Sequence, residues 1–412
     1  MDTVEHQTGD TDRLKNLEEA ETAVKRAREA LTELEDALRV GAALKRSRES
    51  LKDLLNALRL EKRFVQAQGL QVPLDGVTEQ RLRSIVPVTQ PIMLCSQVQR
   101  SGGTLLTRLF DGHPACFAHP SELRWGRLQK RLWPRCDLSA AVVQRDDARQ
   151  HQGWDDLLAQ LDEGWPKRFA KDGYQKFSKW TEKEHPGELR SYPFVFDSAL
   201  QRRIFNVVLE AQTPRSQRDV LNAYLTSLFN AWLDYQNLYR APKQWVTAFQ
   251  PRLIMDGEKS LEGFFADYPD GLLVTIVREP GAWLASFSRH VGGGSVEELL
   301  DLWLESAHAS LRAHTEYPDR VVVLIFEDLV HNTAAVMRAL AERMHIAFSD
   351  SLLEPTYNSM PVLSDSSHAL ATGIDPAVTG RHHGTLPAAD LDAVARRAAP
   401  TFDEIRERFG RR

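Results

Sequence analysis

Residues 91–114 read PIMLCSQVQRSGGTLLTRLFDGHP, and this stretch decides the fold. Its apolar start, 92–95, predicts a buried strand, and Leu106 and Leu109 continue at helical spacing after the glycine pair. A strand that turns through glycines into a helix leaves several backbone N–H groups aimed at one point, with the positive end of the helix dipole behind them. Arg100 stands at the edge of this turn. The stretch therefore predicts an anion-binding loop, and a phosphate is its natural ligand.

Length and composition limit the class of protein. A chain of 412 residues is long enough for one large or two medium domains, and its net charge of −5 argues against a nucleic-acid partner. The three cysteines, Cys95, Cys116 and Cys136, lack paired spacing, which argues against a disulfide framework and a zinc site. No apolar run approaches the roughly 20 residues of a membrane span. The acidic N-terminus lacks the pattern of a signal peptide. We expect a cytoplasmic protein without an integral membrane segment.

The N-terminal region, 1–68, has a helical pattern of its own. Between about 11 and 66 it is nearly free of Gly and Pro, and apolar residues recur every seven positions on either side of Gly41, where the register slips. This predicts two coiled-coil-like helices, either one long helix with a break or an antiparallel hairpin that turns at 39–42. Two roles stay open: packing on the chain's own domain, or a homodimer formed through these helices.

The remainder of the chain, 86–412, alternates strand and helix patterns. Two continuous apolar runs, 271–277 and 320–326, are typical of strands buried on both faces. Such alternation predicts a P-loop-like α/β domain, a parallel sheet flanked by helices that binds ligands at the carboxyl ends of its strands. Residues 138–243 are aromatic and helical in composition, so we expect a helical insertion that caps the sheet. Further elements are expected as a short strand at 115–118 and helices at 334–345 and 390–408.

The loop lacks what a magnesium–triphosphate enzyme needs. The P-loop motif G-x-x-x-x-G-K-[ST] places a lysine on the β- and γ-phosphates. Here Gln97 stands at the first glycine, and no lysine precedes Thr104. An Arg-Ser-Gly loop can still hold one phosphate through backbone N–H groups and the arginine. A divergent nucleotide kinase is therefore an alternative that the sequence disfavours.

Two separated motifs resemble those of one enzyme family. RSGGTLL at 100–106, followed by DGHP at 111–114, resembles the 5′-phosphosulfate loop of sulfotransferases that use 3′-phosphoadenosine 5′-phosphosulfate (PAPS), in the bacterial and tyrosyl-protein branch. The family's second signature, R-D-P at a strand end with a serine eight residues after the arginine, is similar to Arg278-Glu279-Pro280 with Ser286. FEDL at 326–329 resembles a third motif of this branch, Tyr-Glu-Asp-Leu after a later strand. The resemblance covers about 91–123 and 268–344.

The resemblance implies a reaction and a set of binding residues. A sulfuryl group would pass from PAPS, without a metal, to a hydroxyl or amine of a small-molecule or carbohydrate acceptor. Arg278 and Ser286 would hold the 3′-phosphate. Apart from the resemblance, the basic, glycine-flanked loop 379–384 near the C-terminus suits a further phosphate or ring contact through Arg381, with an ordinary surface loop as the alternative. The 5′-phosphate end would be held by the Arg100 side chain and by the loop and helix start, namely Ser101, Gly102, Gly103, Thr104 and Leu105.

The acceptor needs a base within hydrogen-bond reach. In the tyrosyl-protein branch a glutamate shortly after the His-Pro pair serves, and the resemblance implies that Glu122 takes this part. His119 is the alternative catalytic residue, because an imidazole does the same work in cytosolic sulfotransferases. A third interpretation makes Glu122 an acid at a helix start with no catalytic part.

Two departures from the family pattern weaken the assignment of an active enzyme. Many relatives carry a Lys-Thr-Pro segment, and the lysine position here is Phe249. Either Arg252, Lys176 or Lys179 supplies the missing charge, or activity is low or absent. Gly103 also replaces the usual first threonine of the loop. A non-catalytic relative that binds partners through its N-terminal helices is therefore a second alternative, and the sequence leaves the acceptor open.

Overall fold

The structure is a computed structural model. It describes residues 3–38, 50–51, 54–55, 58, 74–123, 125, 131–138, 142–143, 154–161, 166, 169, 174–175, 191–192, 194–256, 258–291, 294–362, 373–380 and 385–410.

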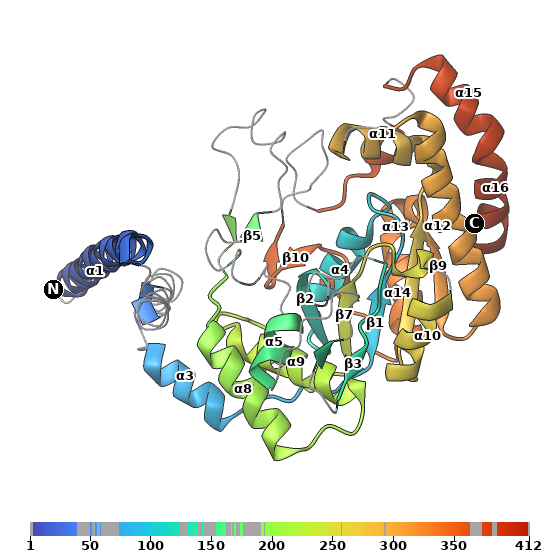
Figure 1. Ribbon diagram of the computed structural model, residues 1–412. Coiled ribbons are helices and arrows are strands. Elements are labelled where there is room, and N and C mark those ends of the chain that lie inside the picture. The colour runs from blue at the N-terminus through green and yellow to red at the C-terminus, as the bar shows by residue number, and fades with distance from the viewer. Residues whose placement is uncertain are drawn as a thin grey trace.

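A five-stranded parallel sheet lies at the centre of the molecule (Figure 1), in the order β2-β7-β1-β8-β9. Its strands are β1 (Ile92–Cys95), β2 (Cys116–Glu122), β7 (Trp245–Phe249), β8 (Leu272–Val277) and β9 (Val321–Ile325). Because β1 is the middle strand, the loop that leaves its carboxyl end lies between the ends of β7 and β8. The parallel α/β sheet predicted from the sequence is confirmed.

The strands are buried on both faces, as their continuous apolar sequence predicts. In β1, Met93 and Cys95 belong to one buried cluster, whereas Ile92 and Leu94 belong to the other. This alternation follows from the two-residue repeat of a strand, which sends successive side chains to opposite faces. Each face is then covered by helices.

One face is covered by three helices, whose apolar side chains share a cluster with Met93. They are α4 (Gly103–Asp111), α13 (Phe326–His331) and α14 (Thr333–Arg343). The opposite face carries the larger core, formed with α8 (Ser198–Ala211), α9 (Gln217–Ala231), α10 (Glu258–Asp267), α11 (Pro280–Val291), α12 (Val296–Glu316), α15 (Ala388–Arg397) and α16 (Ala399–Phe409).

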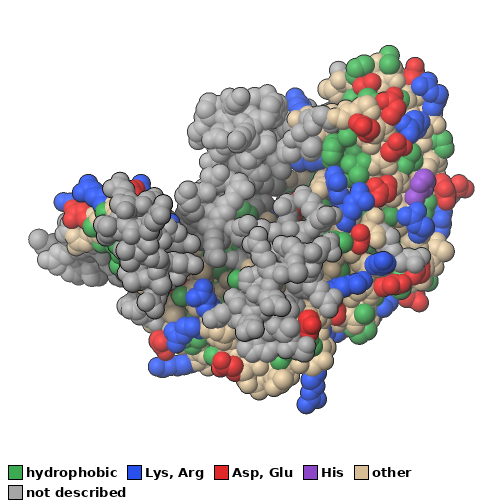
Figure 2. All heavy atoms as spheres, in the orientation of Figure 1, with side chains coloured by type: hydrophobic (Ala, Val, Ile, Leu, Met, Phe, Trp, Pro, Cys, Tyr) green, Lys and Arg blue, Asp and Glu red, His purple; other side chains and the backbone are tan. Residues whose placement is uncertain are grey.

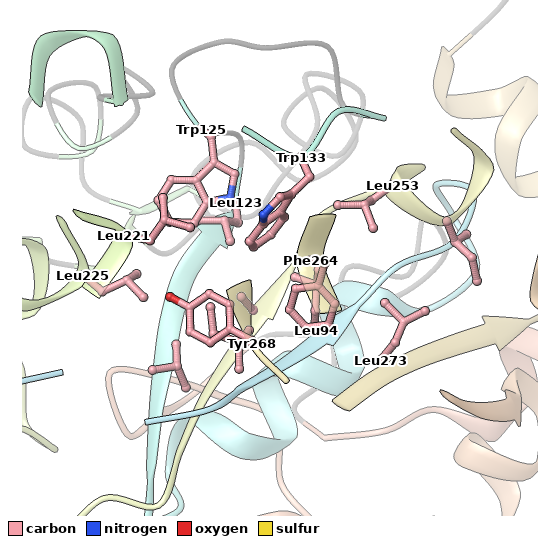
Figure 3. Close-up of a cluster of buried hydrophobic side chains, with 14 of the residues drawn as sticks. Leu94, Leu123, Trp125, Trp133, Leu221, Leu225, Leu253, Phe264, Tyr268 and Leu273 are labelled. Atoms are coloured by element: carbon pink, nitrogen blue, oxygen red, sulfur yellow. The ribbon is translucent and has the colours of Figure 1, made fainter. Parts of the chain in front are cut away.

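Aromatic side chains fill much of the larger core (Figure 3). Trp133 packs edge-on against Phe264 at 5.1 Å and against Tyr268 at 6.2 Å between ring centroids. Its indole N–H donates to Asp267 Oδ2 at 2.6 Å, which satisfies the polar atom of a ring that is otherwise buried. Full burial of a large apolar side chain contributes about 1.5–3 kcal/mol. This layer therefore fixes the sheet against α10 and the segment around Trp133.

The region 138–243 is helical where the structure describes it at length. Helices α5 (Trp154–Leu161), α8 and α9 pack together below the sheet in Figure 1. Helix α9 begins with a capping box between Ser216 and Asp219. Short strand pairs also occur here, β3 (Cys136–Asp137) with β4 (Val142–Val143) and β5 (Tyr174–Gln175) with β6 (Ser191–Tyr192). The bounds of the insertion stay a prediction.

The N-terminal region, 1–68, contains helix α1 (Thr3–Leu38), which lies apart from the sheet in Figure 1. Helix α3 (Leu74–Arg83) follows this region. The turn predicted at 39–42 lies outside the described residues, and the coiled-coil pairing stays a prediction. None of the described helices is long and apolar enough to cross a membrane. On the face shown in Figure 2, acidic and basic side chains are interspersed over the described surface.

Two details differ from the expected elements. Strand β7 was not expected as a strand, because WVTAF is short and contains only part of an apolar run. The expected helix 390–408 is two helices, since Pro400 lacks the N–H that would continue α15 into α16. The remaining short elements are β10 (Thr356–Tyr357), β11 (Met360–Pro361) and the 3₁₀ helices η2 (Leu253–Met255), η3 (Asp350–Leu352) and η4 (Pro376–Thr379).

Candidate active site at the carboxyl ends of the strands

The loop between β1 and α4 has an unusual backbone. Arg100 (φ 72°) and Gly102 (φ 105°) both lie in the left-handed region. A side chain there costs about 1–2 kcal/mol, and a Cβ on Gly102 would also lie 2.5 Å from Phe326 Cδ2. Glycine is therefore required at 102, where the chain turns against the start of α13.

Neighbouring elements hold the carbonyl groups of this loop. Arg252 N donates to Gln97 O at 3.0 Å, and the Trp283 indole donates to Gln99 O at 2.8 Å. The N-cap of α4 is Gly102, which offers no side-chain cap. The first N–H groups of a helix have no acceptor within the helix. With the carbonyls fastened to the scaffold, the uncapped start of α4 is an electropositive site for an anion.

Arg278, at the end of β8, lies directly against this loop. Its Nη1 donates to Arg100 O at 3.0 Å, and its guanidinium stacks over the Phe326 ring at 4.4 Å. The side chain is 8% exposed, and its Nε has no hydrogen-bond partner among the described residues. Burial lowers the pKa of Arg278 to about 10, with Glu327 acting in the opposite direction. Arg278 is therefore a buried cation at neutral pH with one donor unused.

Ser286, on α11, completes the contact between the two motifs. Arg100 Nε donates to Ser286 Oγ at 3.1 Å. The three residues that the sequence assigned to phosphate binding, Arg100, Arg278 and Ser286, are thus joined by two hydrogen bonds across the ends of β1 and β8. The structure brings them to one place.

Glu327 is a half-buried carboxylate beside the second arginine. Its Oε1 accepts from Glu279 N at 3.2 Å, and its Oε2 has no hydrogen-bond partner in the described part of the chain. Burial raises the pKa of Glu327 to about 7, against the lowering effect of Arg278. The sequence offered a signal for this residue, the FEDL motif, but no role for it.

The two candidate bases lie differently on β2. Glu122 is half-buried at the carboxyl end of the strand, where it pairs with Phe249 of β7 after a bulge. His119 is 2% exposed, and its Nδ1 lies 2.8 Å from Ser121 O. Burial lowers the pKa of His119 to about 4, so its imidazole is neutral at neutral pH. Of the two, Glu122 is the last residue of the strand, at the same edge of the parallel sheet as the loop after β1.

The two departures from the family pattern meet in space. A Cβ on Gly103 would lie 2.6 Å from Phe249 Cε2. The Phe249 ring, at the expected lysine position, therefore occupies the room that a threonine at 103 would need. With Phe249 in this place, a side chain at 103 would clash with its ring, a dependence that the sequence alone could not reveal.

The remaining basic candidates are only partly placed. Arg252 Nε donates to Gln99 Oε1 at 2.6 Å, so this guanidinium lies on the loop itself. Lys176, Lys179 and Arg381 fall outside the described residues. The segment before Arg381 does reach the site, because Val378 O accepts from Arg278 Nη2 at 3.4 Å.

The remaining loop positions are also placed. Ser101 is 1% exposed, so its contribution to a ligand would come from the backbone, whereas Thr104 is exposed at the first turn of α4. Leu105 packs partly against the smaller core. Within the described residues no group of three His, Cys, Asp or Glu side chains could hold a metal ion.

One comparison with known proteins identifies a family. The model of the sulfotransferase family matches residues 91–350. None of the curated proteins matches the chain.

Several solved structures are similar to the chain. The sulfotransferase domain of the olefin synthase of Synechococcus PCC 7002 is 17% identical, with 74% of this chain and 93% of that one covered at a TM-score of 0.40. The sulfotransferase domain from the curacin biosynthetic pathway is 16% identical, with 76% and 98% covered at 0.39. Sulfotransferase STF9 from Mycobacterium avium is 14% identical, with 87% and 85% covered at 0.37.

Proposed function

The chain belongs to the sulfotransferase family, and we propose that it transfers a sulfuryl group from PAPS to a hydroxyl or amine of a small-molecule or carbohydrate acceptor. One observation carries the proposal. The Arg100 side chain bonds Ser286, and Arg278 bonds the backbone of Arg100, so cations from two strand ends face one site. A ligand with an anionic group at both ends suits such a pair.

The site's chemistry fits the donor. The uncapped start of α4 and the Arg100 guanidinium would hold the 5′-phosphate end. Arg278, with its unused buried Nε, and Ser286 would hold the 3′-phosphate, the group that distinguishes PAPS from ATP. Because Val378 O accepts from Arg278, the described segment that precedes the late loop lies at this site, and we keep Arg381 as a proposed further contact.

The reaction breaks the bond between sulfur and the bridging oxygen of the 5′-phosphate and forms a bond between sulfur and the acceptor atom. Negative charge gathers on the bridging oxygen, so fixed donors around it lower the barrier. The loop N–H groups and Arg100 would supply these donors. Glu122 would take the acceptor proton, leaving a sulfated acceptor and adenosine 3′,5′-bisphosphate (PAP).

Phe249 favours one competing function. With phenylalanine where relatives have lysine, a non-catalytic protein that keeps the fold and binds partners through its N-terminal helices is the second candidate. It predicts PAP binding without sulfuryl transfer.

Labelled PAPS incubated with panels of glycans, phenols and amines tests the proposal. Mass spectrometry should detect one added SO₃ on an acceptor, and ATP should not be consumed. Binding without transfer to any acceptor would favour the non-catalytic alternative. Consumption of ATP would favour a kinase.

Glu122→Gln tests the base. Because the amide cannot take the acceptor proton, turnover should fall about 100-fold or more, while PAP affinity measured by calorimetry stays unchanged. Glu342→Gln, at an exposed position of α14, is the matched control and should alter neither. If Glu122→Gln turned over at the wild-type rate, another residue would be the one that takes the acceptor proton.

A further inference from the structure

One buried donor at the loop has no described function. Gln97 follows β1, is 0% exposed, and its Nε2 has no hydrogen-bond partner among the residues that the structure describes. Leaving a buried N–H group unsatisfied is unfavourable for folding. Because this unpaired donor lies beside the candidate active site, it points to a bound ligand as its hydrogen-bond acceptor.

The orientation of the Gln97 amide is fixed by its neighbour. Cys95 Sγ lies 3.3 Å from Gln97 Oε1. Burial raises the pKa of the Cys95 thiol far above its ordinary value, so the thiol keeps its proton and donates to the oxygen. The oxygen therefore faces Cys95 and the NH₂ group faces the opposite way.

The NH₂ group faces the start of α4. A Cβ on Gly103 would lie 2.3 Å from Gln97 Nε2, on the residue that begins the helix. In nucleotide-binding P-loops the residue at this position is the lysine that reaches the phosphates. Gln97 Nε2 and the Phe249 ring share the space that a side chain at 103 would take. The structure thus places an amide donor, packed against a phenyl ring, beside the first residue of α4.

We propose that Gln97 Nε2 donates a hydrogen bond to the sulfuryl end of the donor, in place of the lysine ammonium that Phe249 removes. This inference rests on the proposed function. A neutral amide bears less charge than an ammonium, but in a dry, preorganised site a single such donor changes the rate by about 10²–10³-fold. Gln97 is then a catalytic residue that also discriminates PAPS from PAP.

Gln97→Met tests this, because methionine keeps the length and packing of the side chain and removes the donor. We expect PAPS affinity to fall about five- to tenfold, as for one lost hydrogen bond, with PAP affinity unchanged. Transfer should slow about 100-fold. Without any ligand, the melting temperature should rise by roughly 1–2 °C, since a buried unsatisfied donor is gone.

Two further variants sharpen the test. Gln97→Glu keeps an acceptor for Cys95 and places an oxygen where Nε2 was, so it should weaken PAPS binding more than Gln97→Met does. Gln201→Met is the matched control: Gln201 is a 4% exposed glutamine on α8 whose Nε2 also lacks a partner among the described residues. It should leave PAPS affinity and transfer unchanged.

The outcomes separate this inference from the proposed function. If the wild type binds PAPS and PAP but Gln97→Met binds PAPS as tightly as the wild type, the role of Gln97 is wrong and the proposed function stands. A lowered melting temperature with unchanged PAPS discrimination would make the amide structural, which also overturns the inference. If the wild type binds neither nucleotide, the proposed function itself fails.

Discussion

The two ends of helix α4 come from one continuous motif but differ in how their polar groups are satisfied. At the N-terminal end, Gly102 has a positive φ, the helix has no side-chain cap, and Gln97 Nε2 has no partner among the described residues. At the C-terminal end, Asp111 Oδ2 accepts from Thr356 Oγ1 at 2.9 Å and from Ser359 N at 2.8 Å.

The DGHP half of the motif is a structural clamp. His113 Nε2 lies 2.9 Å from Ala347 O, and Asn237 Nδ2 donates to His113 O at 2.8 Å. The buried Arg108 Nη1 lies 4.0 Å from Asp111 Oδ1. A single sequence signature therefore combines a proposed binding end, which has a strained backbone and an unpartnered Gln97 donor, and an anchoring end, where Asp111 Oδ2 and His113 bond to neighbouring segments. Substitutions at the first end should therefore change ligand affinity, whereas substitutions at the second end should change the free energy of unfolding.

The largest effect on ligand affinity is expected at the binding end, in Gly102→Ala. The new methyl group meets Phe326 and forces alanine into the left-handed region. Because Phe326 lies under the Arg278 guanidinium, the displaced ring also moves that arginine. PAP affinity should fall at least about 100-fold, or about 2.8 kcal/mol, by calorimetry. The free energy of unfolding should fall by about 1–2 kcal/mol.

Gly112→Ala is the matched control at the other end of α4. Gly112 has an ordinary φ of −80°, and a Cβ there would lie 3.3 Å from Thr356 Oγ1. This change should leave PAP affinity intact. Equal losses of affinity in the two variants would erase the contrast between the ends.

Asp111→Ala, at the anchoring end, should change stability and leave ligand affinity intact. It removes two accepted hydrogen bonds and the carboxylate beside the buried Arg108, so the free energy of unfolding in urea should fall by about 3 kcal/mol or more. PAP affinity of the folded protein should not change. Thr356→Val, which removes one of the two bonds, should cost only about 1 kcal/mol. Loss of PAP affinity in Asp111→Ala without loss of stability would contradict the anchoring role.

The smallest effect concerns pH at the binding end. Because the pKa of Glu327 is raised to about 7, this carboxyl is mostly protonated below that pH and becomes charged as the pH rises through it. The charge opposes a phosphate near Arg278. One pH unit above 7, Glu327→Gln should therefore bind PAP about fivefold more tightly than the wild type.

One pH unit below 7 the wild type is already neutral at Glu327, so the two proteins should bind PAP equally. Comparison at equal pH cancels the titration of the ligand's own phosphates. If Glu327→Gln bound PAP more tightly than the wild type by the same factor at both pH values, Glu327 would not be the titrating group.

Much of the fold could be predicted from local patterns. Strands β1, β8 and β9 are continuous apolar runs, and the rule that parallel strands meet at their carboxyl ends predicted that Arg100 and Arg278 share a site. Strand β7 could not be predicted, because its five residues become a strand only between β1 and β2. A local sequence pattern carries no information about which strands will lie on either side of a segment.

The site was predictable only where a motif fixes the chemistry. The departures at Gly103 and Phe249 were each visible in the sequence, but their contact was not, since it joins segments far apart in the chain. Gln97 and Glu327 are notable because one buried polar atom of each, Nε2 and Oε2 respectively, has no partner among the described residues. Burial is a property of the packed structure, so composition and spacing carried no signal for their roles.

The central claim is that Arg100 and Arg278 bind opposite ends of one nucleotide. Calorimetric titration of PAP and of 5′-AMP, which lacks the 3′-phosphate, into wild type and Arg278→Ala tests it most directly. The wild type should prefer PAP by about 1.5–3 kcal/mol, the value of a charged hydrogen bond, and Arg278→Ala should lose this preference even if both ligands bind more weakly. An undiminished preference for PAP in Arg278→Ala, or equal affinities in the wild type, would contradict the claim.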